Sequence, residues 1–120
     1  MDYKKLDAWR LAMELAVEIY KVTKQYPKDE LYALTSQTKR AATSIPANIA
    51  EGIGRNYKRD TIQFLHIARG SLYELETLLG LAVQVDILDL NLADQLNVKV
   101  DKCKQVLNGL INYYEKSDLK

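Results

Sequence analysis

The sequence predicts an all-α protein: a single domain, residues 1–120, folded as an antiparallel up-down four-helix bundle whose second helix is kinked at a proline. Apolar residues recur at helical spacing in four segments, and no segment shows a strand pattern. Short connections separate these segments, which favours antiparallel neighbours. Hydrophobic residues make up 48% of the chain and charged residues 28%, as in a folded globular protein rather than a disordered one.

The first helix is predicted to run from Asp7 to Tyr26, because the residue before Pro27 avoids the helical conformation. Its apolar residues form two adjacent stripes with only a narrow polar seam between them. One stripe is Ala8, Leu11, Ala12, Leu15, Ile19 and Val22; the other is Trp9, Met13, Ala16, Val17 and Tyr20. This apolar surface is wider than the arc of roughly 100° that is usual for a surface helix. We therefore expect partners on both sides, with part of the surface facing a neighbouring subunit.

The second helix is predicted to begin at Pro27, a residue that suits the first helical position. Residues at helical spacing along its inner face are Leu31, Leu34, Thr38, Ala41, Ala42, Ile45, Ile49 and Ile53. Pro46 lacks an N–H, and its ring collides with the carbonyl of Ala42, so we expect a bend there. The helix is expected to stop near Gly52 and Gly54, both of which tolerate a left-handed cap.

A short basic connection, residues 55–59, leads to the third helix, which Asp60 and Gln63 are predicted to open as a capping box. The seam of this helix is Leu65, Ala68, Leu72, Leu75, Leu79 and Ala82. Gly70 and Gly80 make another of its faces smooth, which suits close approach by a neighbouring helix.

The fourth helix follows a connection over residues 86–90, and Asn91 is its predicted N-cap. Its inward positions are Leu92, Leu96, Val100, Cys103, Leu107, Leu110 and Tyr114. Cys103 is the only cysteine, which excludes an intrachain disulfide, and at an apolar-periodic position we expect it to behave as a small core residue.

Composition also narrows the location of the protein. No apolar run approaches the roughly 18 residues that a membrane span needs. Four acidic residues lie within the first 20 positions, which argues against a secretory signal. We therefore expect a cytoplasmic protein without a membrane partner.

The sequence offers few residues for catalysis. A two-metal carboxylate site in a bundle needs Glu-x-x-His on two helices, and His66 is the only histidine. Glu74 and Glu76 stand two positions apart and point to different faces of a helix. Residues 52–54 contain too few glycines for a nucleotide-binding fingerprint. We expect no enzyme, no cofactor and no metal, and we interpret His66 as a surface or interface histidine.

Charge is divided unevenly along the chain. Residues 1–59 carry eleven Lys/Arg against seven Asp/Glu, whereas residues 60–120 carry six against nine. This asymmetry hints at a surface that binds a polyanion, although the same charges can simply solvate helix surfaces. The candidate nucleic-acid-binding residues are Lys39, Arg40, Arg55, Lys58 and Arg59. In a straight helix, most of these would form one row that neutralises phosphates in a salt-sensitive way, with Tyr57 available to stack on a base or sugar.

Five residues around the proline are predicted to form a structural motif: Ser44, Pro46, Asn48, Glu51 and Gly52. One interpretation makes Asn48 and Glu51 a recognition surface. The interpretation that we favour has Asn48 satisfy carbonyls freed by Pro46, and Glu51 hold Arg55 in an ion pair four residues away.

In this segment the chain resembles the ribosomal RNA intervening-sequence proteins, whose reading frames lie within inserts of large-subunit ribosomal RNA genes and elsewhere in bacterial genomes. The first matching motif is Thr35, Ser36, Gln37, Lys39, Arg40, Ala41, Ser44, Ile45, Pro46, Asn48, Ile49, Ala50, Glu51, Gly52, Gly54 and Arg55. The second is the run from Phe64 to Ser71, followed by Glu74 and Leu75. Leu6, Trp9, Ala12 and Tyr20 match near the start.

The resemblance implies a four-helix bundle assembled into a ring-like homopentamer. The chain is also similar to accessory proteins of diversity-generating retroelements, which form pentameric barrels that bind nucleic acid and a reverse transcriptase. We therefore expect a non-enzymatic homo-oligomer that binds structured nucleic acid, with RNA favoured, through a basic surface. The alternative is a protein-interaction scaffold that docks a partner such as a reverse transcriptase.

Overall fold

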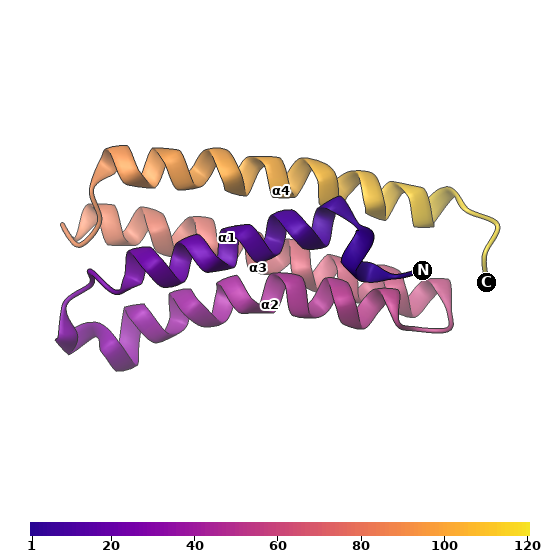
Figure 1. Cartoon of the computed structure of the whole chain (residues 1–120), viewed down its shortest axis with the longest axis horizontal. Helices are drawn as coiled ribbons and strands as arrows, with labels where there is room; N and C mark the ends of the chain where they lie inside the picture. The colour runs from indigo at the N-terminus through magenta and orange to yellow at the C-terminus, as the bar shows by residue number, and fades with distance from the viewer.

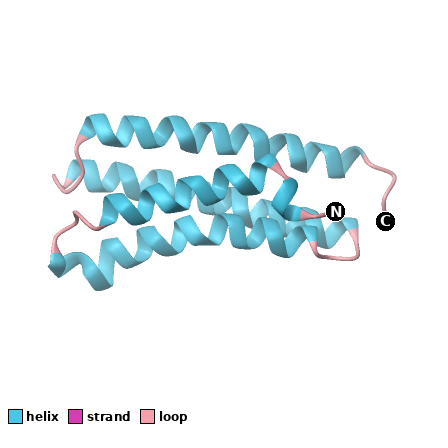
Figure 2. Cartoon of the chain, in the orientation of Figure 1, coloured by secondary structure: helices cyan, strands magenta, loops and turns pink.

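The computed structural model describes residues 1–120 and contains four long helices, which confirms the predicted all-α fold. They are α1 (Asp7–Thr23), α2 (Ser36–Ile53), α3 (Lys58–Gln84) and α4 (Leu90–Lys116). Consecutive helices pack antiparallel, and α4 returns to pack against α1, so the four close into an elongated bundle of 48 × 24 × 20 Å (Figure 1). Only short loops interrupt the helices (Figure 2).

The core runs along the bundle axis and receives side chains from all four helices. Its largest fully buried apolar side chains are Leu15, Ile19, Ile45, Ile49, Leu65, Leu72, Leu75, Leu79, Val100 and Leu107. Each of these lies on one of the predicted inward seams. Burial of a leucine or isoleucine side chain contributes about 1.5–3 kcal/mol relative to leaving it exposed. Cys103 is buried among them, as predicted.

The first helix ends earlier than predicted, at Thr23 rather than Tyr26. The N–H groups of Gln25 and Tyr26 bond to the carbonyls of Val22 and Thr23, which makes a tighter turn before Pro27. The chain therefore leaves the α-helical conformation over a whole turn before Pro27, and not only at Tyr26, the residue whose conformation the proline restricts. Tyr26 itself is buried.

The second α-helix begins nine residues later than predicted. Pro27 is extended (φ −57°, ψ 144°) and precedes a 3₁₀ turn, Lys28–Glu30, and a π-helical turn, Leu31–Thr35. The Glu30 carboxylate accepts the N–H of Leu34 at 3.4 Å and so caps the π turn. Regular α-helix starts only after this, and the first predicted inward residue, Leu31, is exposed.

The second α-helix is continuous through Pro46, whose ring is buried, and the bend expected there stays a prediction. The helix ends at Ile53, between the two glycines as predicted, but neither glycine adopts the left-handed conformation that it would tolerate. Gly54 has a φ of −78°, and its N–H bonds to the carbonyl of Ala50 at 3.1 Å, so the helix ends in right-handed geometry. Gly52 is buried within the last turn.

The predicted starts of the third and fourth helices are also displaced. Helix α3 begins at Lys58, with Tyr57 at the N-cap and no capping box at Asp60. Helix α4 is capped by Asp89, whose Oδ2 accepts the N–H groups of Asn91 and Leu92 at 3.1 and 3.3 Å. A carboxylate is favoured at this position because it also meets the positive end of the helix dipole.

The turn between α3 and α4 depends on one left-handed residue, Asp86, with a φ of 63°. The N–H of Ile87 bonds to the carbonyl of Ala82 at 2.8 Å, and that of Asp86 bonds to the carbonyl of Val83 at 3.1 Å. This is the pair of bonds that defines a Schellman cap, and it reverses the chain so that α4 runs antiparallel to α3.

Candidate nucleic-acid interface

The candidate phosphate-binding residues fall into two groups at opposite ends of α2. Lys39 and Arg40 lie near its start, whereas Arg55, Lys58 and Arg59 lie beyond its end. The groups are about 20 Å apart along the helix axis, at a rise of 1.5 Å per residue. The single row of cations expected for a straight helix does not form. Helix α2 ends at Ile53, before the second group, and Lys58 is already the first residue of α3.

The first group lies in a hollow of about 440 Å³ at the start of α2. Lys39 is half-buried, and its ammonium lies 4.7 Å from the centre of the Tyr20 ring. Arg40 is exposed. Neither side chain forms an ion pair, so both are available to an anionic ligand. An aromatic face against Lys39 also reduces the freedom of its long side chain.

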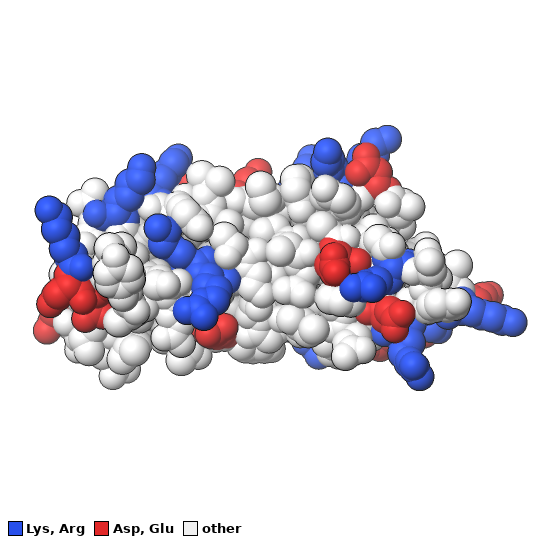
Figure 3. Space-filling view, turned by 90° about the horizontal axis from the view of Figure 1, so that it is seen from below, with Lys and Arg blue, Asp and Glu red and all other residues white.

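Three further cations lie at this end of the bundle, near the start of α2, and were not predicted from the sequence. Lys21 lies in the last turn of α1, Lys24 follows directly after that helix, and Lys28 comes from the 3₁₀ turn. Lys24 and Lys28 share a hollow of about 240 Å³ with Lys39. The turn between α1 and α2 brings them together, and Figure 3 shows basic side chains gathered at this end of the molecule. In the sequence they are single lysines spread over eight positions, without a clustering signal.

These five cations, which we call the basic end, are Lys21, Lys24, Lys28, Lys39 and Arg40. None of them forms an ion pair. Two acidic residues, Asp29 and Glu30, lie in the same connection, and Asp86 and Asp89 lie in the α3–α4 turn at the same end of the bundle (Figure 1). The basic end therefore has unpaired cations but only a small excess of positive charge.

The second group is more constrained. Arg55 donates to the Glu51 carboxylate at 2.8 Å and lies 4.6 Å from the centre of the Phe64 ring, so the structural ion pair is formed. The Lys58 ammonium donates to the carbonyl of Ser117 at 3.1 Å. Only Arg59 is exposed without a partner of either kind.

The predicted structural motif joins α2 to α3. The Asn48 amide donates to the carbonyl and the hydroxyl of Ser44, at 2.8 and 2.9 Å. The Ser71 hydroxyl, on α3, donates to the same Ser44 hydroxyl at 2.9 Å. Asn48 thus bonds to the carbonyl of Ser44 and not to that of Ala42, which is the carbonyl that Pro46 leaves without a partner, so its predicted role of satisfying freed carbonyls stays a prediction.

Gly52 has a packing role instead of a capping role. A Cβ at this position would lie 2.9 Å from the Cβ of Phe64 and 3.1 Å from the carbonyl oxygen of Thr61. The Thr61 hydroxyl donates to the carbonyl of Gly52 at 2.7 Å. The end of α2 thus lies directly against the start of α3, which only a residue without a side chain permits.

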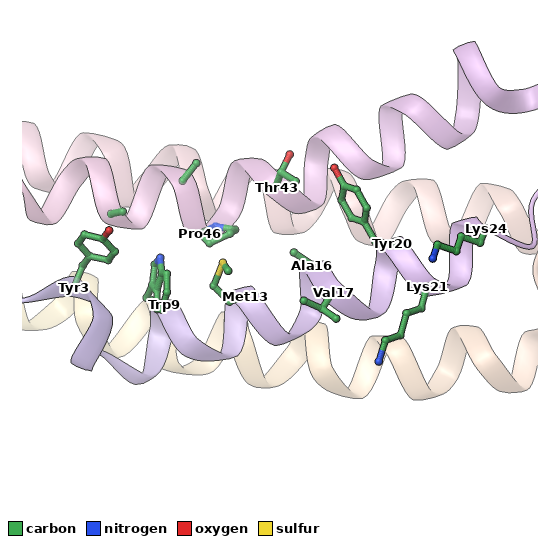
Figure 4. A pocket seen from close by; sticks show the side chains of 12 residues that line it. Tyr3, Trp9, Met13, Ala16, Val17, Tyr20, Lys21, Lys24, Thr43 and Pro46 are labelled. Carbon is green, nitrogen blue, oxygen red and sulfur yellow. The ribbon is translucent and has the colours of Figure 1, made fainter.

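A groove of about 580 Å³ lies between α1 and α2, and its lining is largely apolar (Figure 4). The second apolar stripe of α1 forms one wall, where Trp9 and Met13 point toward Pro46 on α2. Val17 and Tyr20 continue this wall and are 47% and 42% exposed. In Figure 3 a band without charged side chains lies between the two charged ends of the molecule.

Comparison with known proteins places the chain in a family. A family model described as 23S rRNA-intervening sequence protein matches residues 4–109. The chain belongs to this family. The match includes all five candidate phosphate-binding residues, the groove and the polar contacts around Ser44, and it ends before the last turns of α4.

A solved structure supports the fold of this family member. It is the crystal structure of a protein of unknown function from the S23 ribosomal protein family of Bacteroides thetaiotaomicron. The two chains superpose with a TM-score of 0.83 at 24% sequence identity, over 93% of this chain and 99% of the other. At this identity the likeness concerns the fold alone. No curated protein matches the chain.

Two titratable side chains are of chemical interest, Cys103 in the core and His66 on the surface. Burial, and then the charge of Glu14, raise the pKa of the Cys103 thiol to about 11, so it is protonated at neutral pH. His66 lies on the surface, with Nδ1 2.9 Å from Arg69 and Nε2 3.7 Å from Glu115.

No three side chains of the metal-ligating types gather in one place. No helix has the length and apolar character needed to cross a membrane.

We expect the replacement Asn48→Ala to lower the free energy of unfolding by about 1–3 kcal/mol, because the carbonyl and the hydroxyl of Ser44 then lose a half-buried partner. Urea denaturation of the purified protein measures this loss. Gln37→Ala is the matched control, since Gln37 is an exposed amide on the same helix with no hydrogen bond from its side chain. Equal stability of the two variants would show that the Asn48 contacts contribute nothing.

Proposed function

We propose that this chain is a non-enzymatic homo-oligomer that binds structured RNA through the basic end. The observation that carries the proposal is the presence of five cations without ion pairs at one end of the bundle, four of which line two adjoining hollows. Such cations are free to replace the counterions around RNA phosphates, and the release of those counterions drives binding. The family description, which refers to an intervening sequence of 23S rRNA, favours RNA over other polyanions.

The proposed assembly follows from the groove and from the family resemblance. The groove leaves Met13, Val17 and Tyr20 of each chain exposed beside one another, and exposed apolar patches of this kind mark interaction surfaces. The resemblance implies five copies in a ring. Five basic ends on one particle would bind one RNA together, and multivalency of this kind compensates for weak single contacts.

The test is the double charge reversal Lys39→Glu/Arg40→Glu. Binding of a fluorescent RNA hairpin is measured by anisotropy across a series of salt concentrations. We expect the affinity to fall at least roughly tenfold at low salt, and the slope of log affinity against log salt to fall by about 1.4–1.8, because two phosphate contacts are lost per bound site.

The control is Lys102→Glu/Lys116→Glu, which changes the net charge equally at two exposed lysines without ion pairs, on the middle and last turns of α4 and away from the basic end. This variant should bind RNA nearly as well as the wild type. If both double variants lose affinity alike, binding reflects net charge and not the basic end. If neither loses affinity, the proposed interface is wrong.

A second candidate function, a scaffold that docks a protein partner such as a reverse transcriptase, is favoured by the same groove. An apolar groove between two helices accepts an amphipathic helix from a partner as readily as one from another copy. The two candidates differ in what they bind: the scaffold predicts a protein that binds no bare RNA and copurifies with a protein partner.

A further inference from the structure

A third hollow, of about 260 Å³, lies at the opposite end of the bundle from the basic end. Its walls come from the α2–α3 connection, the start of α3 and the last turns of α4. Two exposed tyrosines, Tyr57 and Tyr113, line it together with three cations, Arg55, Lys58 and Lys120. We propose that this hollow, the end hollow, binds one unpaired nucleotide, with the base against the tyrosines and the phosphate against the cations.

The two tyrosines are both exposed to solvent, although they line the same cavity. Tyr57 is 63% exposed and Tyr113 is 55% exposed, although they come from segments more than fifty positions apart in the sequence. A single exposed tyrosine needs no explanation, but two that face one hollow provide a stacking surface. The ring of Tyr113 also packs edge-on against buried Tyr114, with centroids 5.3 Å apart and planes at 89°. Tyr113 is therefore ordered before any ligand arrives.

Two cations of the end hollow, Arg55 and Lys58, are held in place by their own contacts. Lys58 uses one of its three donors on the carbonyl of Ser117, and Arg55 uses one of its five on Glu51. The remaining donors are available to a phosphate. No side chain caps the N-terminus of α3 at Tyr57, so its first free N–H groups add positive potential at the same place.

The size and chemistry of the hollow favour a nucleotide. Its volume is below the roughly 300–1,000 Å³ of pockets for drug-sized ligands, so its occupant is a small group. Aromatic faces beside cations are the usual arrangement for unpaired bases with their phosphates, and RNA loops present such bases. The inference rests on the proposed function for the source of the nucleotide, namely a loop of the RNA that the basic end binds.

The test compares Tyr57→Ala and Tyr113→Ala with Tyr73→Ala, a control that removes a similarly exposed tyrosine from the middle of α3. Each variant is titrated with an RNA hairpin that has an adenine-rich loop and with a blunt RNA duplex of equal length. We expect the first two variants to lose about 5- to 150-fold in affinity for the hairpin, as stacking of one base implies. Duplex binding should be unchanged, and Tyr113→Phe should restore hairpin binding.

Three results separate this inference from the proposed function. Equal hairpin affinity in all tyrosine variants, with binding still lost in Lys39→Glu/Arg40→Glu, overturns the end hollow alone. If the wild type binds no RNA, adenosine monophosphate is titrated by calorimetry: binding that Tyr57→Ala abolishes keeps the end hollow, with free nucleotide as its source. Absence of both RNA and nucleotide binding overturns the end hollow and the proposed function together.

Discussion

Replacement of Gly52 by alanine is expected to lower the free energy of unfolding by about 1–3 kcal/mol, the usual cost of an added methyl group in a tightly packed site. The new Cβ would lie 2.9 Å from the Cβ of Phe64, which is fixed to the α3 backbone, and 3.1 Å from a backbone oxygen. Neither atom is the flexible end of a side chain. The two helices must therefore separate, which also weakens the 2.7 Å bond from Thr61 to the Gly52 carbonyl.

Thermal and urea unfolding of Gly52→Ala measure this effect, and Gly109→Ala is its control. Gly109 lies on α4, where an added Cβ meets nothing within 4 Å. There alanine should raise stability by about 0.5–1 kcal/mol, because it is a better helix former than glycine. The same substitution thus has opposite signs at the two sites. A Gly52→Ala protein as stable as the wild type would mean that α2 and α3 are not in close contact.

Val17→Glu is expected to dissociate the oligomer into monomers while the helix content stays unchanged. Val17 is 47% exposed in the wall of the α1–α2 groove, so the substitution leaves the core of the single chain intact. In an assembly that covers the groove, the glutamate would instead lose its water. Its nearest cation in the groove is Lys21, four residues along α1, and an ion pair offsets the desolvation of a buried carboxylate only when its geometry is excellent.

Val98→Glu tests whether this effect belongs to the groove. Val98 is 70% exposed on α4 and outside the groove, so the same substitution there should leave the mass of the assembly unchanged. Sedimentation velocity with circular dichroism measures assembly and folding on the same samples. A wild-type mass for Val17→Glu, or dissociation by both variants, would contradict the assignment of the groove to self-assembly.

The helix interiors could be predicted from sequence, whereas the helix ends could not. Many apolar residues in each helix follow the 3.6-residue period, so a single residue that departs from this period does not hide the pattern. An end depends on one or two side chains: Asp89 and Asn91 are both good caps, and only the backbone shows that Asp89 is used. Helix α3 begins directly after Tyr57, whose side chain makes no capping hydrogen bond, so no sequence signal marks this helix start.

The candidate site was predictable only in part, for a different reason. Lys39 and Arg40 stand out as neighbours in a motif, but Lys24 and Lys28 join them only because the chain turns between α1 and α2. The sequence likewise marks Gly52 as important and does not show that Phe64 lies against it. Contacts between segments decide both features, and a helical pattern does not contain them.

The measurement that tests the central proposal most directly is the light-scattering mass across a size-exclusion column, with and without a structured ribosomal RNA fragment, at low and moderate salt. We predict a particle of five times the 13.7 kDa of one chain, which gains the mass of the RNA at low salt and loses it at moderate salt. A monomer, or an oligomer whose mass is indifferent to RNA at both salt concentrations, would contradict the proposal.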